Sequence, residues 1–295
     1  MKKSIFKGCA TALVTPMLKN GDVNYECLKS LVETQIESGI DALVICGTTG
    51  EKSTLEYDEH LKVIETAIKV CGGRVPIIAG TGSNDTAHSV KLCLDAEKLG
   101  ADALLMVTPY YNKTSQIGLI EHYNHIADRV TKPIILYNVP SRTGMNITPE
   151  TYKQLSKHKN IVAVKEASGN ISQIAKIKYF CGDDLDIYSG NDDQTIPILA
   201  LGGIGLISVA SNIIPRVMCE ICHEYLNGNT KYASELQNRY LGLLNALFYD
   251  VNPIPVKSAM NMLGYNVGNC RLPLCEIDKG ALDLLKAKLT ECNLM

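Results

Sequence analysis

Lys165 ends an apolar run, at a position where a buried strand normally carries another aliphatic side chain. Ile161–Val164 precede it and are rich in β-branched residues, whereas Glu166–Gly169 follow it with polar and small residues. Burying an ammonium group is costly, so such a lysine tends to lose its proton, and a neutral amine attacks carbonyl carbons to form a Schiff base. The simpler interpretation is a lysine that ends its strand and points into solvent. Whether other residues with suitable chemistry lie near Lys165 decides between these two interpretations.

Tyrosine and threonine residues at other strand ends could carry the proton transfers that imine chemistry needs. Tyr137 ends the preceding apolar run and could protonate the imine or the substrate carbonyl. Thr48 and Tyr111 could then pass protons between that phenol and solvent. Each has a structural alternative, because Tyr137 could fill a barrel interior and Thr48 could cap a helix. Asp192 and Asp193 could simply be solvated carboxylates. Taken singly, these structural alternatives are favoured, and the convergence of the groups on one rim is what favours catalysis.

The same strand ends argue against other kinds of active site. They lack an inward histidine pair, a two-carboxylate metal set and a Ser/His/Asp arrangement. Hydrolysis by a metal ion and acyl transfer by a serine triad are therefore poorly supported. We expect neither a metal ion nor a cofactor.

Composition and charge describe a globular protein. The chain has 295 residues, 46% of them hydrophobic and 20% charged, with a formal net charge of −2. This charge provides no field suited to nucleic acid, and the apolar runs are too short to span a bilayer. The start, Met1–Gly8, has basic residues but no apolar stretch of signal-peptide length. We therefore expect a cytoplasmic enzyme.

The eleven cysteines do not form a disulfide or metal framework. They are scattered, their number is odd, and Cys219 and Cys222 make a lone CxxC followed by His223. A lone CxxC is a weak redox or metal signal, and reduced, mostly buried thiols are typical of a large cytosolic fold.

One unit recurs along the chain: a short β-branched run that ends in polar or glycine residues, followed by an amphipathic helical pattern. The predicted strands lie in Gly8–Pro16, Asp41–Gly50, Val75–Gly82, Ala101–Tyr110, Pro133–Pro140, Ile161–Gly169, Leu185–Asn191 and Gly205–Asn212. The helices between them include Tyr25–Ser38, Tyr57–Val70, Thr86–Leu99, Ile117–Val130 and Pro149–His158. Eight such units predict a (β/α)8 TIM barrel, built from right-handed βαβ crossovers. The alternative, an open doubly wound sheet, needs a GxGxxG loop after its first strand, and none is present.

The residues beyond the eighth strand are too many for one closing helix. Helical periodicity continues in Val217–Leu226, Thr230–Leu247, Ile254–Leu263 and Lys279–Leu289. We therefore expect a barrel over residues 1–225 and a C-terminal helical extension packed on it over residues 226–295. Whether the apolar faces of these helices serve the core or an oligomer interface stays open.

Several motifs at the strand ends resemble the dihydrodipicolinate synthase family. They are Gly47–Glu51, Pro109–Lys113, Tyr137–Thr143, Lys165–Gly169, Ser189–Asp193 and Gly205–Val209, together with Asn252–Lys257 and Arg271–Leu274 near the C-terminus. The resemblance covers the chain from about residue 4 to its end. It implies that pyruvate forms a Schiff base with Lys165 and that the resulting enamine adds to the aldehyde of aspartate semialdehyde. The product would be the cyclic precursor of diaminopimelate and lysine.

The resemblance also implies roles for individual residues. Tyr137, Thr48 and Tyr111 match the proton-relay positions, with the tyrosine at position 111 reaching in from a neighbouring subunit of a homo-oligomer, usually a tetramer built from two dimers. Arg142 would bind the carboxylate of the second substrate, since a guanidinium and a carboxylate can form two parallel hydrogen bonds. The pyruvate-facing positions match Thr49 and the main chains of Gly190 and Ile207.

Two other functions remain as alternatives. Sister enzymes that cleave sialic acid or keto-deoxy sugar acids share the lysine and tyrosine but generally lack the pair Arg142–Thr143. A catalytically silent barrel that binds a keto acid would have lost a relay residue, whereas all of them are present here.

The sequence departs from the family pattern where many members bind lysine as a feedback inhibitor. The departures lie at Lys52, Tyr57 and His88. A fixed cation at Lys52 and the lack of a carboxylate at His88 disfavour the ammonium group of an amino acid. We expect inhibition by lysine to be weak or absent.

Overall fold

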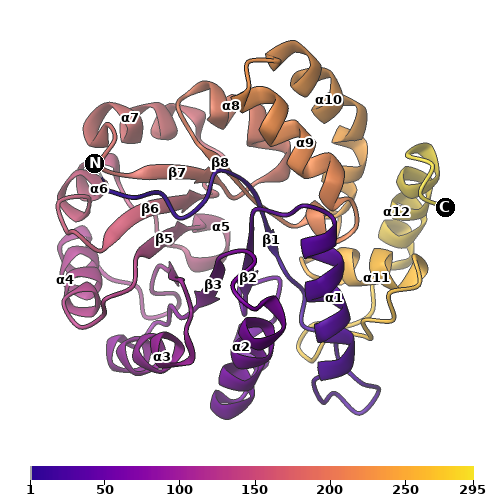
Figure 1. Ribbon diagram of the computed structural model, residues 1–295, viewed down its shortest axis with the longest axis horizontal. Coiled ribbons are helices and arrows are strands. Elements are labelled where there is room, and N and C mark those ends of the chain that lie inside the picture. Colours follow the sequence, from indigo (N-terminus) through magenta and orange to yellow (C-terminus); the bar gives the residue numbers. More distant parts are fainter. Residues whose placement is uncertain (1) are drawn as a thin grey trace.

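The computed structural model describes residues 2–295 and places a closed barrel of parallel strands at the centre of the molecule (Figure 1). The strands are β1 (Gly8–Ala12), β2 (Ala42–Ile45), β3 (Ile77–Gly80), β4 (Ala103–Val107), β5 (Ile134–Asn138), β6 (Ile161–Glu166), β7 (Asp186–Ser189) and β8 (Gly205–Ser208). Each strand pairs with the next, and β8 pairs with β1 to close the barrel. The barrel prediction is confirmed, and the open sheet is excluded.

Helices surround the barrel, as the recurring sequence unit predicts. Between strands lie α1 (Tyr25–Glu37), η1 (Lys52–Thr54), α2 (Tyr57–Cys71), α3 (Thr86–Leu99), α4 (Gln116–Ala127), α5 (Pro140–Thr143), α6 (Pro149–Leu155), α7 (Ile171–Cys181), η2 (Asp192–Gln194) and α8 (Thr195–Ala200), and η3 (Ala210–Asn212) and α9 (Pro215–Leu226) follow β8. Local chemistry sets their ends. Helix α3 begins where the Asp85 side chain accepts a hydrogen bond from the Ala87 amide, and it ends at Gly100 in the left-handed conformation.

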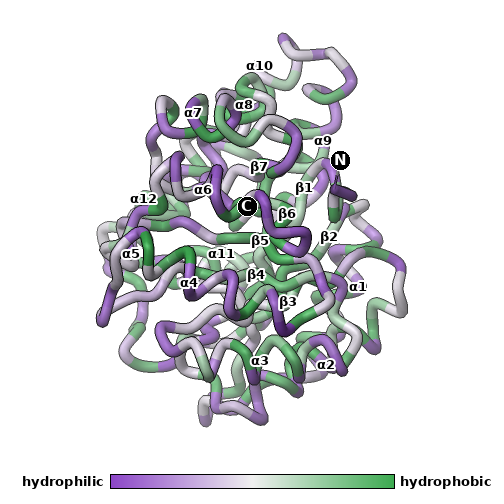
Figure 2. Tube along the Cα trace, turned by 90° about the vertical axis from the view of Figure 1, so that its left-hand side faces the viewer, coloured by the Kyte–Doolittle hydropathy of each residue, from purple (hydrophilic) through white to green (hydrophobic). Residues whose placement is uncertain are grey.

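Alternate residues of each strand face two separate cores. Ile135 and Tyr137 of β5 pack with Ala163 of β6 inside the barrel, whereas Leu136 and Val164 pack outward beneath the helices. The strands are consequently apolar on both faces and appear as hydrophobic segments in the middle of the chain trace (Figure 2).

A register shift between β5 and β6 decides which residue meets Tyr137. Ile134 pairs with Ile161, but the next pair is Ile135 with Ala163, so that β6 has one additional residue at this point. Without that shift Tyr137 would pair with the outward-facing Val164. With it, Tyr137 pairs with Lys165, and both side chains turn toward the barrel interior.

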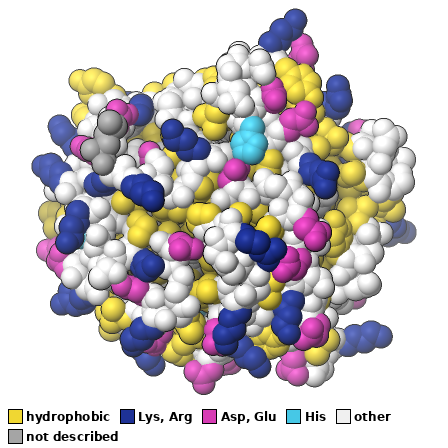
Figure 3. Space-filling model, in the orientation of Figure 1, with side chains coloured by type: hydrophobic (Ala, Val, Ile, Leu, Met, Phe, Trp, Pro, Cys, Tyr) yellow, Lys and Arg dark blue, Asp and Glu magenta, His cyan; other side chains and the backbone are white. Residues whose placement is uncertain are grey.

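The surface carries charges of both signs. On the face shown in Figure 3, lysine and arginine side chains are interspersed with aspartate and glutamate. No helix within residues 2–295 is long and apolar enough to cross a membrane.

Three further helices, α10 (Thr230–Ala246), α11 (Ile254–Met262) and α12 (Lys279–Glu291), follow the barrel (Figure 1). Helices α10 and α11 contact elements of the barrel, and α12 packs on α10 and α11. Gln237 of α10 bonds to the barrel with both ends of its amide, because its Nε2 donates to the Asp193 carbonyl and its Oε1 accepts from the Ile196 amide. The expected helical extension is therefore present, while the division at residue 226 stays a prediction.

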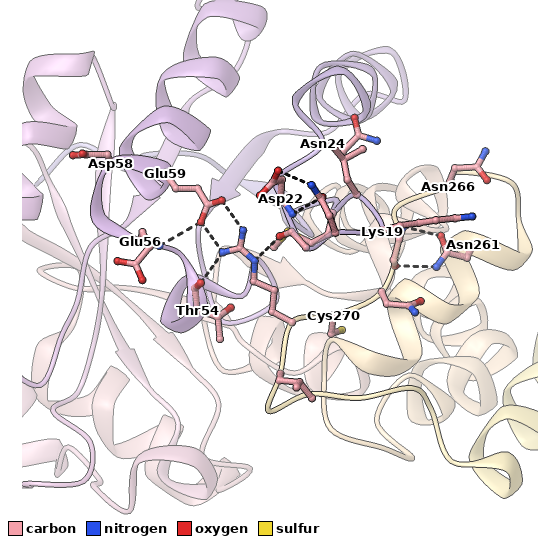
Figure 4. Close-up of a pocket in the computed structure, with 18 residues that line it drawn as sticks. Lys19, Asp22, Asn24, Thr54, Glu56, Asp58, Glu59, Asn261, Asn266 and Cys270 are labelled. Carbon is pink, nitrogen blue, oxygen red and sulfur yellow. Dashed lines mark hydrogen bonds and ion pairs between the residues drawn. The ribbon is translucent and has the colours of Figure 1, made fainter.

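The extension is fixed to the barrel by ion pairs. Lys257 of α11 and Glu51 form an almost fully buried pair with an Nζ–Oε1 distance of 2.8 Å. The Nζ of Lys257 also donates to the Thr15 and Asn269 carbonyls, and the Arg271 amide donates to Glu51 Oε2. The Arg271 guanidinium in turn donates to the Glu59 carboxylate and to the Thr54 carbonyl. These three residues line a cavity of about 1440 Å³, which Figure 4 shows. Glu51 ends the turn that carries Thr48 and Thr49, so this C-terminal segment fixes that turn.

We predict that Lys257→Met lowers the free energy of unfolding by about 3–5 kcal/mol, because it leaves the Glu51 carboxylate buried without its cation. Urea denaturation followed by circular dichroism measures the change. Lys69→Met is the matched control, since Lys69 pairs with Glu65 at 2.6 Å but is 70% exposed; it should cost at most about 0.5 kcal/mol. Equal losses in the two variants would contradict the prediction.

Candidate active site

Lys165 points into the mouth of the barrel and not into solvent. Its side chain is 6% exposed, and its Nζ lies 4.5 Å from the centre of the Tyr137 ring. Burial lowers the Lys165 pKa from 10.5 to about 8; the Asp192 carboxylate opposes this change, and the Arg142 guanidinium adds to it. The amine is consequently neutral in an appreciable fraction of molecules near neutral pH, as a nucleophile requires.

Tyr137 presents a buried phenol next to this amine. Burial raises the pKa of Tyr137, whereas the Arg142 charge and a hydrogen bond with Thr48 lower it. The net direction is upward, so the phenol keeps its proton and can donate it. Thr48, partly buried in the turn after β2, is thus brought to Tyr137 as the sequence predicts.

Tyr111 is not packed into this site within the chain. It lies in the loop between β4 and α4, its side chain is 92% exposed, and its φ angle is 69°. A non-glycine residue in this left-handed conformation is uncommon and marks a loop held in a defined shape. The structure therefore brings Lys165, Tyr137 and Thr48 together and leaves Tyr111 projecting from the surface.

The main chain approaches Lys165 closely at Gly190. A methyl group on Gly190 would lie 2.8 Å from the Ala167 Cβ and 3.2 Å from the Lys165 Cε, so only glycine fits there. Ile207 of β8 is fully buried in the barrel interior. Gly190 therefore forms the wall of the site next to the amine, and Ile207 belongs to the same inner core as Tyr137.

Thr49 and Arg142 are joined through a residue that the sequence analysis did not assign. The Nδ2 of Asn252 donates to the Thr49 hydroxyl, and the Asn252 carbonyl accepts from Arg142 Nη2, both at 3.0 Å. Asn252 is 5% exposed, and its buried Oδ1 has no hydrogen-bond partner among the residues that the structure describes. Its place in the motif Asn252–Lys257 was the available signal. Next to Arg142 the surface opens into a cavity of about 650 Å³ that Phe248 also lines.

The interpretation of Asp192 as a solvated carboxylate is wrong. Asp192 is 2% exposed, and its Oδ2 accepts hydrogen bonds from the Val209 and Ala210 amides at 3.1 Å each. The reason is that η2 begins at Asp192 and turns its side chain toward the end of β8. Asp193, one residue further on, is exposed as expected.

The assembled groups suit imine chemistry. A buried amine of lowered pKa can add to a keto carbon, and a protonated phenol beside it can supply the proton that releases water. An arginine at the mouth can bind a carboxylate on a second reactant.

Comparison with known proteins identifies the family. The model of the dihydrodipicolinate synthetase family matches residues 5–292. The 4-hydroxy-tetrahydrodipicolinate synthase 1 of Clostridium acetobutylicum is 55% identical over 286 residues, which cover 97% of each chain. A chloride-inhibited dihydrodipicolinate synthase of Acinetobacter baumannii, solved with pyruvate, has a TM-score of 0.97 and 41% identity, covering 99% of this chain and 100% of that one. A relative from Cyanidioschyzon merolae, solved with lysine bound, has a TM-score of 0.96 and 40% identity, covering 99% and 100%. The chain belongs to the dihydrodipicolinate synthetase family.

Proposed function

We propose that the chain condenses pyruvate with L-aspartate 4-semialdehyde to give 4-hydroxy-tetrahydrodipicolinate, the reaction named in its curated relatives. It is a Schiff-base lyase of the diaminopimelate and lysine pathway. The observation that carries the residue assignment is the buried Lys165 amine, with a pKa lowered to about 8, against the Tyr137 ring.

In the first half of the reaction, the neutral Lys165 amine adds to the keto carbon of pyruvate. Tyr137 donates the proton with which the former keto oxygen leaves as water, and Thr48 passes protons to and from the phenol. Loss of a proton from the pyruvate methyl group then turns the iminium into a nucleophilic enamine. The main chains of Gly190 and Ile207 and the Thr49 hydroxyl hold the pyruvate carboxylate in this scheme.

In the second half, the enamine carbon attacks the aldehyde of aspartate semialdehyde. Arg142 binds the carboxylate of that substrate at the mouth of the barrel, which positions the aldehyde above the enamine. The amino group of the same substrate then displaces Lys165, closing the ring and releasing the enzyme. A carboxylate-binding arginine at this place favours the aldehyde of an amino acid over a keto-deoxy sugar acid.

The chain acts as a homo-oligomer in this proposal, and a tetramer built from two dimers is our preferred state. The exposed side chain of Tyr111 supports it, because a phenol that projects from one subunit can complete the proton relay of another. The protein is placed in the cytoplasm, where its eleven cysteines, all free thiols in the structure, stay reduced.

Weak or absent inhibition by lysine also stays a prediction. The Lys52 ammonium donates a hydrogen bond to the Gly82 carbonyl, and burial lowers its pKa to about 8. Tyr57 donates to Asp95 and contacts the edge of His88, while Asn84 donates to the Tyr110 carbonyl. This group of residues already holds an ammonium of its own, which argues against a second one from free lysine.

The pH dependence of adduct formation tests the assignment of Lys165. Because its pKa is lowered to about 8, the neutral fraction rises with pH up to that value and then levels off. The rate at which pyruvate forms a borohydride-reducible adduct should rise about tenfold per pH unit below 8 and become constant above it. Mass analysis of the Lys165 peptide in quenched samples measures the rate. A midpoint near 10.5, the value of an exposed lysine, would refute the lowered pKa; absence of an adduct would refute the mechanism.

Arg142→Ala tests the second substrate. We expect the KM for aspartate semialdehyde to rise roughly 30-fold, because a charged hydrogen bond of about 2 kcal/mol is lost. The pyruvate adduct on Lys165 should still form. Arg239→Ala, at an exposed position on α10, is the control and should leave both constants unchanged. Steady-state pyruvate consumption gives these values. An unchanged KM, together with cleavage of a keto-deoxy sugar acid, would favour the aldolase alternative.

Co-assembly of two inactive variants tests whether Tyr111 acts across a subunit boundary. Tyr111→Phe and Lys165→Met should each have little activity alone. In a randomly mixed oligomer, about one quarter of the sites combine an intact Lys165 with a neighbour's intact Tyr111, so about a quarter of the activity should return. Co-expression with two different affinity tags provides the mixture. Activity that stays at the average of the two variants would place Tyr111 in its own subunit's site or outside catalysis.

A further inference from the structure

We propose that Asp192 is the positioning residue and counter-charge of the Schiff-base centre, holding the two backbone segments beside Lys165 and balancing the positive charge of the iminium. This inference rests on the proposed function and adds a residue to it. The carboxylate lies at the junction of the β7 and β8 ends, where the wall of the site is formed.

The first observation is the unequal use of the two carboxylate oxygens. Oδ2 accepts hydrogen bonds from the Val209 and Ala210 amides, whereas Oδ1 is buried without a partner within residues 2–295. A buried carboxylate oxygen without a donor is unfavourable unless another group stabilises it. A cation formed during the reaction provides that stabilisation.

The second observation is the position of Asp192 in the chain. It follows Gly190 by two residues, and Gly190 lies against the Lys165 Cε. Through Oδ2 it binds the amides that come two and three residues after Ile207, and the Thr195 hydroxyl donates to its carbonyl at 2.8 Å. One side chain therefore ties together the two segments proposed to hold the pyruvate carboxylate.

The charges around the amine agree with this role. Lys165 lies against the Tyr137 ring on β5. The charged groups that act on its pKa are the Asp192 carboxylate on η2 and the Arg142 guanidinium on α5. Burial raises the pKa of Asp192, whereas the Ser208 hydroxyl of β8, the two amides and the Lys165 charge lower it and favour the carboxylate form. Asp192 is thus the anion that raises the Lys165 pKa, against burial and Arg142, which lower it.

Imine formation increases the need for such an anion. The neutral amine and the keto group take up one proton and release one water, so a neutral nitrogen becomes a positively charged iminium covalently bound at the barrel mouth. This cation cannot move into solvent, and a fixed carboxylate in a site of low dielectric stabilises it more strongly than water-exposed charges would.

Asp192→Asn removes the charge while keeping an oxygen that can accept from the amides. The acidic midpoint of pyruvate-adduct formation should fall by about one pH unit, because the amine loses its neighbouring anion. The kcat for condensation should fall about tenfold, since the iminium is less stable. Asp193→Asn is the matched control: it changes an exposed neighbour on the same turn and should behave like the unchanged protein. Asp192→Glu keeps the charge and should keep the midpoint while losing part of kcat.

Borohydride trapping against pH, steady-state kinetics and thermal melting are measured on all three variants and on the unchanged protein. A midpoint that stays fixed in Asp192→Asn while melting drops would mean a structural role only and would overturn the proposal. A shifted midpoint in Asp192→Glu would do the same, so the test survives misfolding of the asparagine variant. If the unchanged protein forms no adduct at Lys165, the proposed function fails instead, independently of Asp192.

Discussion

The site depends on the register between two neighbouring strands. One additional residue in β6, between the pair Ile134–Ile161 and the pair Ile135–Ala163, places Lys165 opposite Tyr137 and turns both inward. The side chain of Glu166, the next residue, is held by Asn138, Tyr152 and the Ser168 amide. Because successive strand residues point to opposite faces, fixing Glu166 on one side also fixes the direction of Lys165 on the other.

Burial determines the state of the amine, and the charges around it moderate the effect. Desolvation lowers the Lys165 pKa to about 8 even though the Asp192 carboxylate raises it. Without Asp192 the pKa of Lys165 would be lower, so a larger fraction of the free amine would be neutral. The iminium, however, would lose the anion that we propose stabilises it. The same site therefore serves both charge states of the nitrogen: burial favours the neutral amine, and the Asp192 carboxylate is the counter-charge that we propose for the iminium.

The sequence predicted the barrel because its signals are local. Each observed strand lies within the β-branched run predicted for it, and α3 has the predicted bounds, where an aspartate cap and a glycine mark both ends. The place of the site followed from the rule that barrel chemistry lies at the C-terminal strand ends. The register shift at Val162 had no local signal, although it decides which side of β6 faces the phenol. The burial of Asp192 had no local signal either. Its side chain is held by the Val209 and Ala210 amides, which follow β8 and are distant from it in the sequence.

Residues of the C-terminal extension help to position the residues of the site. The extension is therefore part of the same structural unit as the barrel. Lys257 and Arg271 fix Glu51, whose turn carries the threonines, and Asn252 joins Thr49 to Arg142. None of these contacts follows from periodicity, since each joins the barrel to helices that come after it. The cost of burying Lys257 and Glu51 is offset only while the extension stays docked. Docking therefore holds Thr49 and Arg142 in one fixed arrangement, and the barrel alone would lack it.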